Sequence, residues 1–500
     1  MVKIKRFFCL VLFCLCVFSL SLSLSSCSSN EVEKISKGLS TYTISATLED
    51  DMTISGSETV NYVNSTGLDL NEIYFHLYPR AFRQDALIKP YTTLTMASCF
   101  PNGISYGDIQ IKSVFVKNEQ RDVILSGEDE DILQVNLGYL LKNKDSIEIK
   151  IDFSIIIPNC THRFGYYLGS INLGNWYPVI CGYKNGEFEK NPYYSTGDPF
   201  FSDISNYNIS LTYPKKYQIA STGNINVLDN GSTYTSNIQA KAVRDFAINL
   251  SENTSKIQAK VGDTEVIYYG YKSDENLQKY LKISTEAVEY FNKVFGKYPY
   301  STLSVVKTPF IYGGMEYPNI VFISDAIDDE DEYLKVIVHE IAHQWWYATV
   351  GNDEVTEAWL DESLSEYSTA LFFSNYTGYG ISYDELVGNA VSSYTLYVDV
   401  IKTIRGEVNT KMDLPINKYQ NDYEYSYMIY VKGVIMFDEL KKVVGTDKII
   451  SGLKKYYSDN KFKIASKLDF YKAFSSACHK DLENFFEGYL NGTTIITNIN

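Results

Sequence analysis

The chain has 500 residues, 45% of them apolar and 21% charged, so it is long enough for two to four domains and is neither collagen-like nor wholly disordered. It contains 45 Lys and Arg against 61 Asp and Glu, a formal net charge of −16 at pH 7. Such an acidic surface would repel phosphate, which argues against nucleic acid as a partner.

The N-terminal segment, residues 1–26, has the pattern of an export signal. Basic residues precede an apolar run from Phe7 to Leu20. Leu24-Ser25-Ser26-Cys27 then resembles a bacterial lipobox, in which the cysteine is lipidated and becomes the new N-terminus. The alternative is an uncleaved signal anchor, and either would export the chain and attach it to the membrane. We expect a lipid-anchored protein on the extracellular side of the cell membrane, with a polar tether over residues 27–40.

Four cysteines remain beyond Cys27, and they form no CxxC motif. They are Cys99, Cys160, Cys181 and Cys478. We expect buried free thiols, with Cys160–Cys181 as the one plausible disulfide.

Residues 41–263 are predicted to form one mainly antiparallel β domain. Apolar and polar residues alternate from Met52 to Tyr62, the period of a half-buried strand. Clusters of Asn, Asp and Gly typical of turns separate this run from similar ones. Those further strands are expected at Ile109–Val116, Ile132–Leu137, Ser146–Ile157, Tyr207–Tyr213 and Ala242–Leu250.

The period changes near Ser273, which indicates a second domain over residues 264–500. Apolar residues from Leu277 to Phe295 recur at helical spacing, and Gly296 follows as a C-cap. Short strands at 303–307 and 319–324, helices at about 330–348 and 356–374, and a largely helical remainder are expected. The predicted fold class is therefore α+β, with an antiparallel β domain followed by a mainly helical domain.

Two of the five histidines form the motif His339-Glu340-Ile341-Ala342-His343 on one of these helices. Residues at i and i+4 share a helix face, so both imidazoles can bind one metal ion. Glu340 would then lie beside a bound water but outside the coordination shell. The alternative, two unrelated surface histidines, requires the motif to arise by chance in a chain that is poor in histidine.

A catalytic zinc site needs a third protein ligand and an open position. Glu362 supplies the ligand, in the segment Trp359-Leu360-Asp361-Glu362. The 18 residues between His343 and Glu362 are enough to end one helix, turn and return along another. Glu366, one turn further, could accept a hydrogen bond from a ligand histidine, or could be a solvated carboxylate. The expected cofactor is one zinc ion per chain.

These motifs resemble those of the gluzincin metallopeptidases. Gly313-Gly314-Met315-Glu316-Tyr317 narrows the resemblance to the aminopeptidase N family, whose signature G-(A/G)-M-E-N lies on a strand that edges the cleft. Tyr430-Val431-Lys432-Gly433 resembles the family's Y-x-K-G, which supplies a transition-state tyrosine. The resemblance covers about residues 41–490. It implies a thermolysin-like catalytic domain, peptide substrates, and a substrate ammonium held by Glu316 beside Gly313, Gly314 and Met315.

The sequence also departs from the family pattern. Tyr317 stands where the family has Asn, and from the short stretch after the catalytic domain we expect the family's C-terminal helical-repeat domain to be absent. The family's second amine-binding residue, a Gln or Glu of the β domain, has only weak candidates here, Asn172 and Asn175. Tyr425, five residues before Tyr430, resembles a second tyrosine of the family. This match is less firm than that of Tyr430 to the Y-x-K-G tyrosine.

Three functions remain open. The first is a zinc aminopeptidase in which Glu340 is the general base and Tyr430 stabilises the oxyanion. The second is a zinc endopeptidase on the same scaffold, and the third is a non-catalytic surface binding protein with a degenerate peptidase fold. The complete motif set argues against the third. The other histidines lack ligand spacing and are expected to be structural: His76, His162 and His479.

Overall fold

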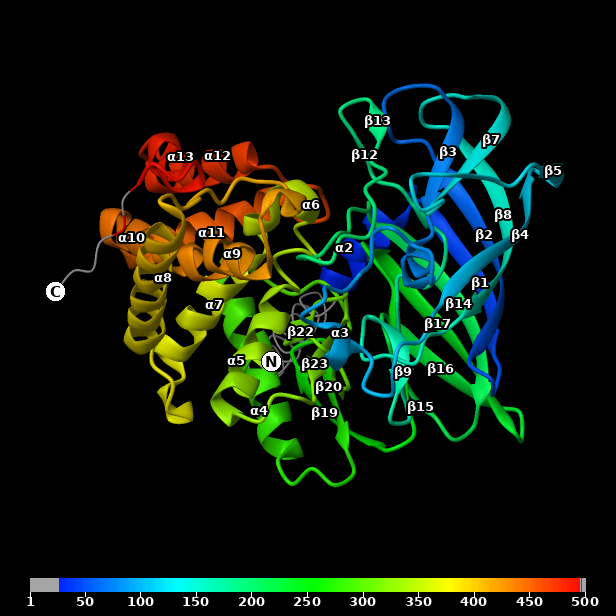
Figure 1. The fold of residues 1–500 in the computed structure, drawn as a ribbon, viewed down its shortest axis with the longest axis horizontal. Coiled ribbons are helices and arrows are strands. Elements are labelled where there is room, and N and C mark those ends of the chain that lie inside the picture. Colours follow the sequence, from blue (N-terminus) through cyan, green and yellow to red (C-terminus); the bar gives the residue numbers. More distant parts are fainter. Residues whose placement is uncertain (1–26, 495, 497–500) are drawn as a thin grey trace, which may run out of the picture.

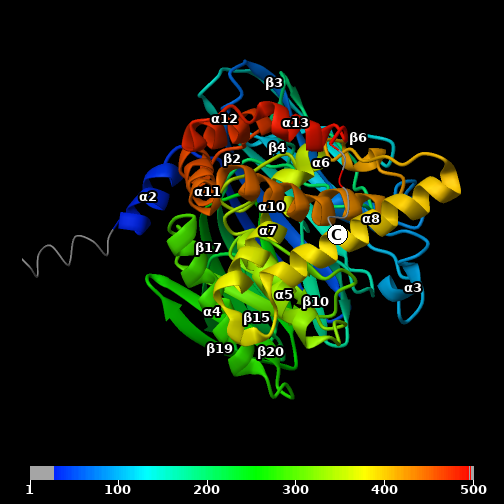
Figure 2. The same ribbon diagram turned by 90° about the vertical axis from the view of Figure 1, so that its left-hand side faces the viewer.

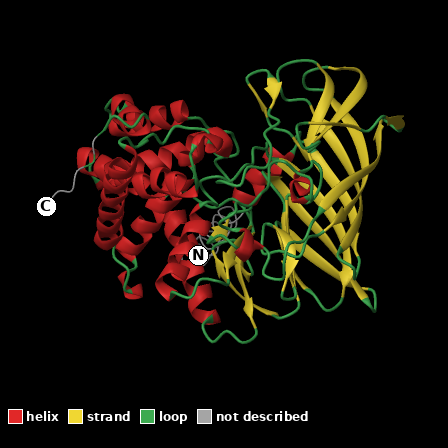
Figure 3. Ribbon diagram, viewed as in Figure 1, coloured by secondary structure: helices red, strands yellow, loops and turns green. Residues whose placement is uncertain are grey.

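The computed structural model describes residues 27–494 and residue 496. The strands of the N-terminal half lie on one side of the molecule and the helices of the C-terminal half on the other (Figures 1 and 3). The expected α+β class is thereby confirmed. Within the described part of the chain, no helix is long and apolar enough to cross a membrane. The expected export signal, residues 1–26, lies outside the described residues.

The expected polar tether begins with a helix, α2 (Cys27–Ser36), and the helix packs on the fold. Val32 is buried in the core. Two ion pairs hold the helix in place, Glu31–Lys461 at 2.5 Å and Glu33–Lys241 at 2.6 Å. Because these contacts reach both halves of the molecule, most of this segment is not a free spacer. Figure 2 shows α2 at the opposite side of the molecule from α8 (Tyr383–Arg405).

The main sheet of the N-terminal half has eight strands in the order β16-β17-β14-β1-β2-β8-β4-β5. All neighbours are antiparallel except β1 and β14. Alternate residues of β1 are buried, as the period of two predicts. The strands are β1 (Thr41–Leu48), β2 (Thr53–Val63), β4 (Asp108–Val116), β5 (Glu119–Arg121), β8 (Ser146–Ile156), β14 (Ser205–Pro214), β16 (Asn224–Asp229) and β17 (Thr233–Val243).

Two four-stranded sheets complete the β half, in the orders β15-β18-β10-β9 and β11-β3-β7-β6. A small hairpin, β12 (Tyr183–Lys184) and β13 (Glu187–Phe188), extends from them. The strands of the two sheets are β3 (Leu70–His76), β6 (Ile124–Ser126), β7 (Ile132–Leu141), β9 (Phe164–Tyr167), β10 (Ser170–Gly174), β11 (Val179–Ile180), β15 (Gln218–Ser221) and β18 (Ala247–Ser251). Short helical turns, η1 (Tyr78–Phe82) and α3 (Met96–Cys99), lie between β3 and β4.

The single strand expected over Ala242–Leu250 is wrong. β17 ends at Val243 in the main sheet, and β18 begins at Ala247 in another sheet. Arg244 lies in the break, fully buried. Its guanidinium donates to the carbonyl oxygens of Tyr347, Ser202 and Lys463, at 3.0 to 3.2 Å. The Tyr347 and Lys463 carbonyls belong to the C-terminal half, so Arg244 links the two halves at this break.

A five-stranded sheet opens the C-terminal half, in the order β19-β20-β21-β23-β22. Its strands are β19 (Thr254–Val261), β20 (Thr264–Tyr271), β21 (Thr302–Thr308), β22 (Gly314–Met315) and β23 (Ile320–Ser324). The boundary expected after residue 263 falls inside the β19–β20 hairpin. Because both strands of that hairpin belong to this sheet, the C-terminal part of the fold begins at Thr254.

Helices make up most of the remainder. The helix expected over 330–348 ends at Ala342, and the one expected over 356–374 is preceded by short turns and starts at Glu362. The helices besides α8 are α4 (Leu277–Val294), α5 (Glu330–Ala342), α6 (Glu354–Glu357), η2 (Ala358–Leu360), α7 (Glu362–Asn375), η3 (Thr377–Tyr379), η4 (Ile416–Lys418), α9 (Asp422–Ser426), the π-helical turn η5 (Tyr427–Val431), α10 (Lys432–Val444), α11 (Thr446–Asn460), α12 (Lys467–Cys478) and α13 (Glu483–Leu490).

The four described cysteines beyond Cys27 are free thiols as expected, but only Cys99, Cys160 and Cys181 are buried, and Cys478 is partly exposed. The disulfide considered for Cys160 and Cys181 is not formed. The Cys160 thiol lies instead beside that of Cys99. The backbone explains this neighbour, because the amide of Thr161 donates to the Cys99 carbonyl at 3.0 Å.

Candidate active site

Helix α5 presents the two histidines of the HExxH motif. Its N-cap, Asp329, accepts a hydrogen bond from the Glu332 amide. Three acidic residues in the first turn interact favourably with the positive end of the helix dipole. His339 lies in the last turn and His343 is the C-cap, so both side chains leave the helix on one face. Their Nε2 atoms are 3.0 Å apart.

Glu362, the first residue of α7, completes a set of three convergent donors. Its Oε2 lies 3.2 Å from Nε2 of His339 and 3.2 Å from Nε2 of His343. The two histidines draw the pKa of the Glu362 carboxyl below its usual range, although burial alone would raise it. All three side chains are buried or nearly so.

This donor set fits a zinc ion. Ligands about 2.0–2.2 Å from a tetrahedral zinc lie roughly 3.3–3.6 Å from one another, slightly more than the 3.0 to 3.2 Å here. Nδ1 of His343 lies 3.1 Å from the Trp346 carbonyl, which can only accept, so the proton sits on Nδ1 and Nε2 is free to bind metal.

Glu366 does not hydrogen-bond the ligand histidine as expected. Its Oε1 lies 3.6 Å from Nδ1 of His339, which has no hydrogen-bond partner among the described residues. At this distance the two groups make an electrostatic contact. A role for Glu366 in orienting His339 stays a prediction.

Glu340 extends from α5 toward the cleft, and the adjacent strand β22 shapes its surroundings. Burial raises the pKa of its carboxyl to about 8. A Cβ atom at Gly314 would lie 2.2 Å from Oε1 of Glu340, so any side chain there would displace this carboxylate. A Cβ at Gly313 would meet nothing closer than 3.6 Å, and this residue is exposed in the cleft.

Glu316, directly after β22, is a buried carboxylate at the wall of the cleft. It is 3% exposed, and within residues 27–494 its Oε1 has no hydrogen-bond partner. Burial, followed by the nearby Asp198 and Glu340, raises the pKa of this carboxyl well above its usual value. Met315 points the other way, and its sulfur accepts a hydrogen bond from Nε of Arg163 at 2.9 Å.

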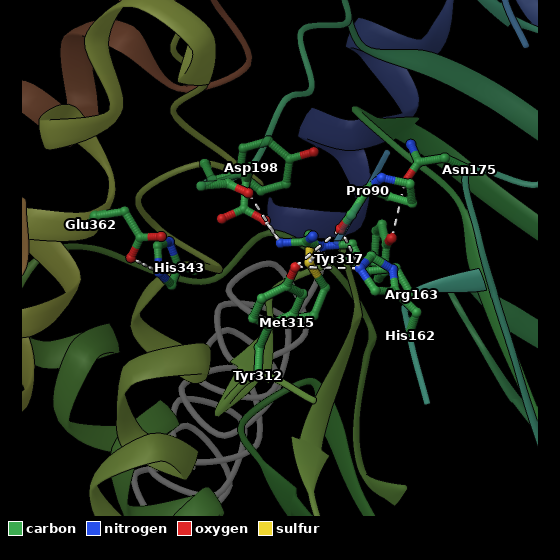
Figure 4. A network of polar contacts seen from close by, with 12 residues as sticks. Pro90, His162, Arg163, Asn175, Asp198, Tyr312, Met315, Tyr317, His343 and Glu362 are labelled. Atoms are coloured by element: carbon green, nitrogen blue, oxygen red, sulfur yellow. Dashed lines mark hydrogen bonds and ion pairs between the residues drawn. The ribbon is translucent and has the colours of Figure 1, made fainter. Parts of the chain in front are cut away.

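The β domain contributes an ion pair that the sequence did not indicate. Arg163 donates from Nη2 to Asp198, and both residues are buried (Figure 4). One carboxylate oxygen of Asp198 lies within 4.8 Å of oxygens of Glu316 and Glu362. No spacing in the sequence marks either residue, because they come from separate loops of the β domain. Asp198 therefore places a second carboxylate, in addition to that of Glu316, beside the three donors.

Asn172 and Asn175 were the weak candidates for the family's second amine-binding residue. Neither of them lines the cleft. Asn172 bonds the Pro309 carbonyl and Thr308, which joins β10 to the C-terminal half. Asn175 accepts a hydrogen bond from the hydroxyl of Tyr317 at 2.9 Å. These contacts between the two halves occupy the Asn172 amide and the amide oxygen of Asn175, so neither weak candidate reaches the cleft.

The replacement of the family's Asn by Tyr317 is accommodated within β10. A Cβ atom at Gly174 would lie 2.0 Å from the Tyr317 hydroxyl oxygen, so a glycine makes room for the ring. Tyr317 is fully buried and its hydroxyl is satisfied by Asn175. The substitution thus points away from the cleft and leaves Glu316 in place.

Tyr430 reaches the donor set from the π-helical turn η5. Its hydroxyl donates to Oε1 of Glu362 at 2.5 Å, and burial raises its pKa well above the usual value, so it keeps its proton. Such π turns are frequent at functional sites. Gly433 lets the following helix approach α7, since a Cβ there would lie 2.4 Å from Oγ of Ser363. Tyr425 is buried with its ring 5.8 Å from that of Tyr430.

The cleft that joins these groups has a volume of about 520 Å³, in the range of small-molecule sites. The β domain lines one wall with Arg163, Asp198 and Gly197. Helices α5, α7 and α8 and the turn η5 line the others. The remaining histidines lie elsewhere: His76 stacks on Tyr78, His162 is buried against the Pro90 carbonyl, and His479 caps α12.

The chain was compared with known proteins. Residues 280–489 match the peptidase family M1 domain. The chain is 29% identical over 236 residues to aminopeptidase B of Homo sapiens, which covers 43% of this chain and 34% of that protein. It is 27% identical over 229 residues to aminopeptidase N of Lactobacillus helveticus, 42% of this chain and 26% of that protein. The match thus spans about a third or less of these curated relatives.

Solved structures resemble both halves of the fold. An M1 zinc metallopeptidase from Deinococcus radiodurans aligns with a TM-score of 0.62 at 13% identity, over 91% of this chain and 94% of that one. A mutant of that enzyme bound to a Tyr-Ser-Ala substrate aligns equally well, at 0.62. With the sequence matches, this likeness confirms the resemblance to the aminopeptidase N family of gluzincins.

Proposed function

We propose that this chain, whose residues 280–489 match the peptidase family M1 domain, is a zinc aminopeptidase that removes N-terminal residues from peptides. One observation carries the proposal. The donor atoms of His339, His343 and Glu362 converge within 3.0 to 3.2 Å, beside two buried carboxylates that face the same cleft. The first group suits hydrolysis, and the second suits recognition of an ammonium.

The hydrolytic roles follow from what each side chain can donate or accept. Zinc held by the three donors would act as a Lewis acid toward the scissile carbonyl and lower the pKa of the attacking water. In its ionised form, Glu340, whose pKa burial raises to about 8, takes the proton of that water and passes it to the leaving amine. The Tyr430 hydroxyl, which already reaches Glu362, donates to the oxyanion that develops on the substrate.

Recognition of the N-terminus is assigned to Glu316 and Asp198. Their oxygens lie within 4.8 Å of each other, a gap that one ammonium can bridge with two charge-assisted hydrogen bonds. The ion pair with Arg163 orients Asp198, and Nε of Arg163 in turn donates a hydrogen bond to the sulfur of Met315. Because this pair also lies within 4.8 Å of a Glu362 oxygen, a bound ammonium would leave only the first peptide bond near the donor set.

The test compares one peptide in free and N-acetylated forms, cleaved by wild type, by Glu316→Ala and by Glu332→Ala. Glu332 is an exposed carboxylate that also lines the cleft, which makes it the matched control. Wild type should contain one zinc per chain, lose activity to a chelator and cleave the free peptide preferentially. Glu316→Ala should reduce kcat/KM for the free peptide by at least about tenfold, and Glu332→Ala should not.

Equal cleavage of both forms at internal bonds would replace this proposal by the endopeptidase alternative. Binding without any hydrolysis would favour the non-catalytic alternative.

Export and anchoring form a separate part of the proposal. The lipobox-like Leu24-Ser25-Ser26-Cys27 supports lipidation of Cys27 and a location on the extracellular side of the cell membrane. Metabolic labelling with a fatty acid, followed by fractionation, would test it. Wild type should be labelled and pellet with membranes, and Cys27→Ser should lose the label.

A further inference from the structure

A second group of buried carboxylates lies behind the ammonium site. Glu316, Glu354 and Asp361 each place an oxygen within 4.8 Å of the other two. They are 3%, 1% and 1% exposed. Three carboxylates this close and this far from water cannot all be ionised without a compensating charge, because like charges repel strongly at low dielectric. One of them must hold a proton, or a cation must lie between them.

The hydrogen bonds around the three residues differ. Asp361 accepts a hydrogen bond from Nδ2 of Asn352 at 2.9 Å, which favours its charged form. Glu316 lines the cleft, where an ammonium would favour its charged form as well. Glu354 has neither kind of support, since no donor of the described residues reaches either of its oxygens. The Asp361 carboxylate, with an oxygen within 4.8 Å, lies in hydrogen-bonding contact with it.

We propose that Glu354 is a positioning residue that holds the proton of this group and donates it in a hydrogen bond to Asp361. An unpartnered carboxylate at this depth would be costly, whereas a carboxylic acid is the donor that Asp361 still lacks. Burial, and then the negative charges of Asp361 and Glu316, raise the pKa of Glu354 well above its usual value.

The hydrogen bond has two consequences for the cleft, and the inference rests on the proposed aminopeptidase function. With Glu354 neutral, Glu316 can stay ionised and pair with the substrate's ammonium. Asp361 is also the N-cap of α7 and directly precedes Glu362. Its hydrogen bonds to Glu354 and Asn352 therefore fix the start of the helix that presents the third donor.

The test compares Glu354→Gln with Glu354→Ala, and Glu357→Gln is the control. Gln has the shape of the neutral acid and donates a hydrogen bond, whereas Ala leaves Asp361 without this donor. Glu357 lies on the same short helix and accepts a hydrogen bond from the Lys467 amide at 3.0 Å. We expect Glu354→Gln and the control to stay within about threefold of wild type in kcat/KM for a free-amine peptide. In Glu354→Ala, kcat/KM for this peptide should fall by at least about tenfold, mainly through a higher KM. Its preference for the free over the acetylated peptide should be weaker than that of wild type.

Infrared difference spectra give a readout that does not depend on activity. Wild type minus Glu354→Gln should show the carbonyl band of one protonated carboxyl group, shifted in deuterated water, and wild type minus Glu357→Gln should not. An equal loss of activity in Glu354→Gln and Glu354→Ala, an absent band, or a second metal ion that Glu354→Gln releases would each overturn the inference. Wild type that contains zinc but cleaves no free-amine peptide would instead refute the proposed function.

Discussion

The hydroxyl of Tyr430 donates a hydrogen bond to Oε1 of Glu362, whose other oxygen faces both histidines of the HExxH motif. The ring of Tyr430 also lies 5.9 Å from that of His339, nearly parallel to it. Both contacts hold the tyrosine at the donor set.

Replacing Tyr430 by Phe should therefore reduce kcat by roughly 10²–10³ with little change in KM, because the lost contact forms mainly in the transition state. Zinc content and melting temperature should stay close to those of wild type. Tyr427→Phe is the matched control, since Tyr427 lies on the same π turn and stacks on Tyr397. Unchanged kcat in Tyr430→Phe would mean that the residue only packs against its neighbours.

The role of Glu340 can be separated from metal binding. Glu340→Gln preserves the shape of the side chain but cannot take a proton, so kcat should fall by roughly 10²–10⁴ while one zinc ion per chain is retained. Metal analysis and steady-state kinetics on the same preparation would check both expectations. His343→Ala should lose the zinc as well. Wild-type kcat in Glu340→Gln would assign the base to another group.

The two glycines before Met315 should respond differently to a methyl group. Gly314→Ala would place a Cβ 2.2 Å from Oε1 of Glu340, so the carboxylate must move, and we expect at least about a tenfold loss in kcat. Gly313→Ala meets nothing closer than 3.6 Å and should stay near wild type. Similar kinetics in the two variants would show that the contact between Gly314 and Glu340 does not place the base.

The buried pair of Arg163 and Asp198 should matter for stability as well as for substrate. Arg163→Met leaves Asp198 buried without its partner, which typically costs about 3–5 kcal/mol in the free energy of unfolding. Adding Asp198→Asn should restore part of that loss but not the preference for a free N-terminus. Denaturant unfolding of both variants measures the first effect. A fully stable Arg163→Met protein would show that water compensates the carboxylate.

His76 should make the protein sensitive to mild acid. Burial lowers the pKa of His76 to about 4, below the usual value of about 6.5, so the unfolded chain binds its proton first. The free energy of unfolding should therefore fall as pH drops from about 6.5 toward 4, by up to about 3 kcal/mol from this group. His76→Gln should lose less stability over this interval than wild type, and exposed His479→Asn should match wild type. Parallel curves for wild type and His76→Gln would contradict the assignment.

The sequence alone predicted the elements of the site that depend on local geometry. The spacing of His339 and His343 places both on one helix face whatever the rest of the chain does, since 3.6 residues make a turn. The alternation in the first half and the change to helical spacing near Ser273 likewise indicated the α+β class. Helix ends were less predictable from the sequence. The helix α5 stops at Ala342, whereas the expected helix ran to about residue 348.

Only the tertiary structure decided which distant residues meet at the cleft. Asp198 and Arg163 come from loops of the β domain with no motif of their own, and Asn172 and Asn175 are taken up by contacts between the two halves. The physical reason is that long-range neighbours depend on how complete sheets and helices pack. A carboxylate or an amide has the same local sequence signature whether it faces a substrate, a buried arginine or another strand.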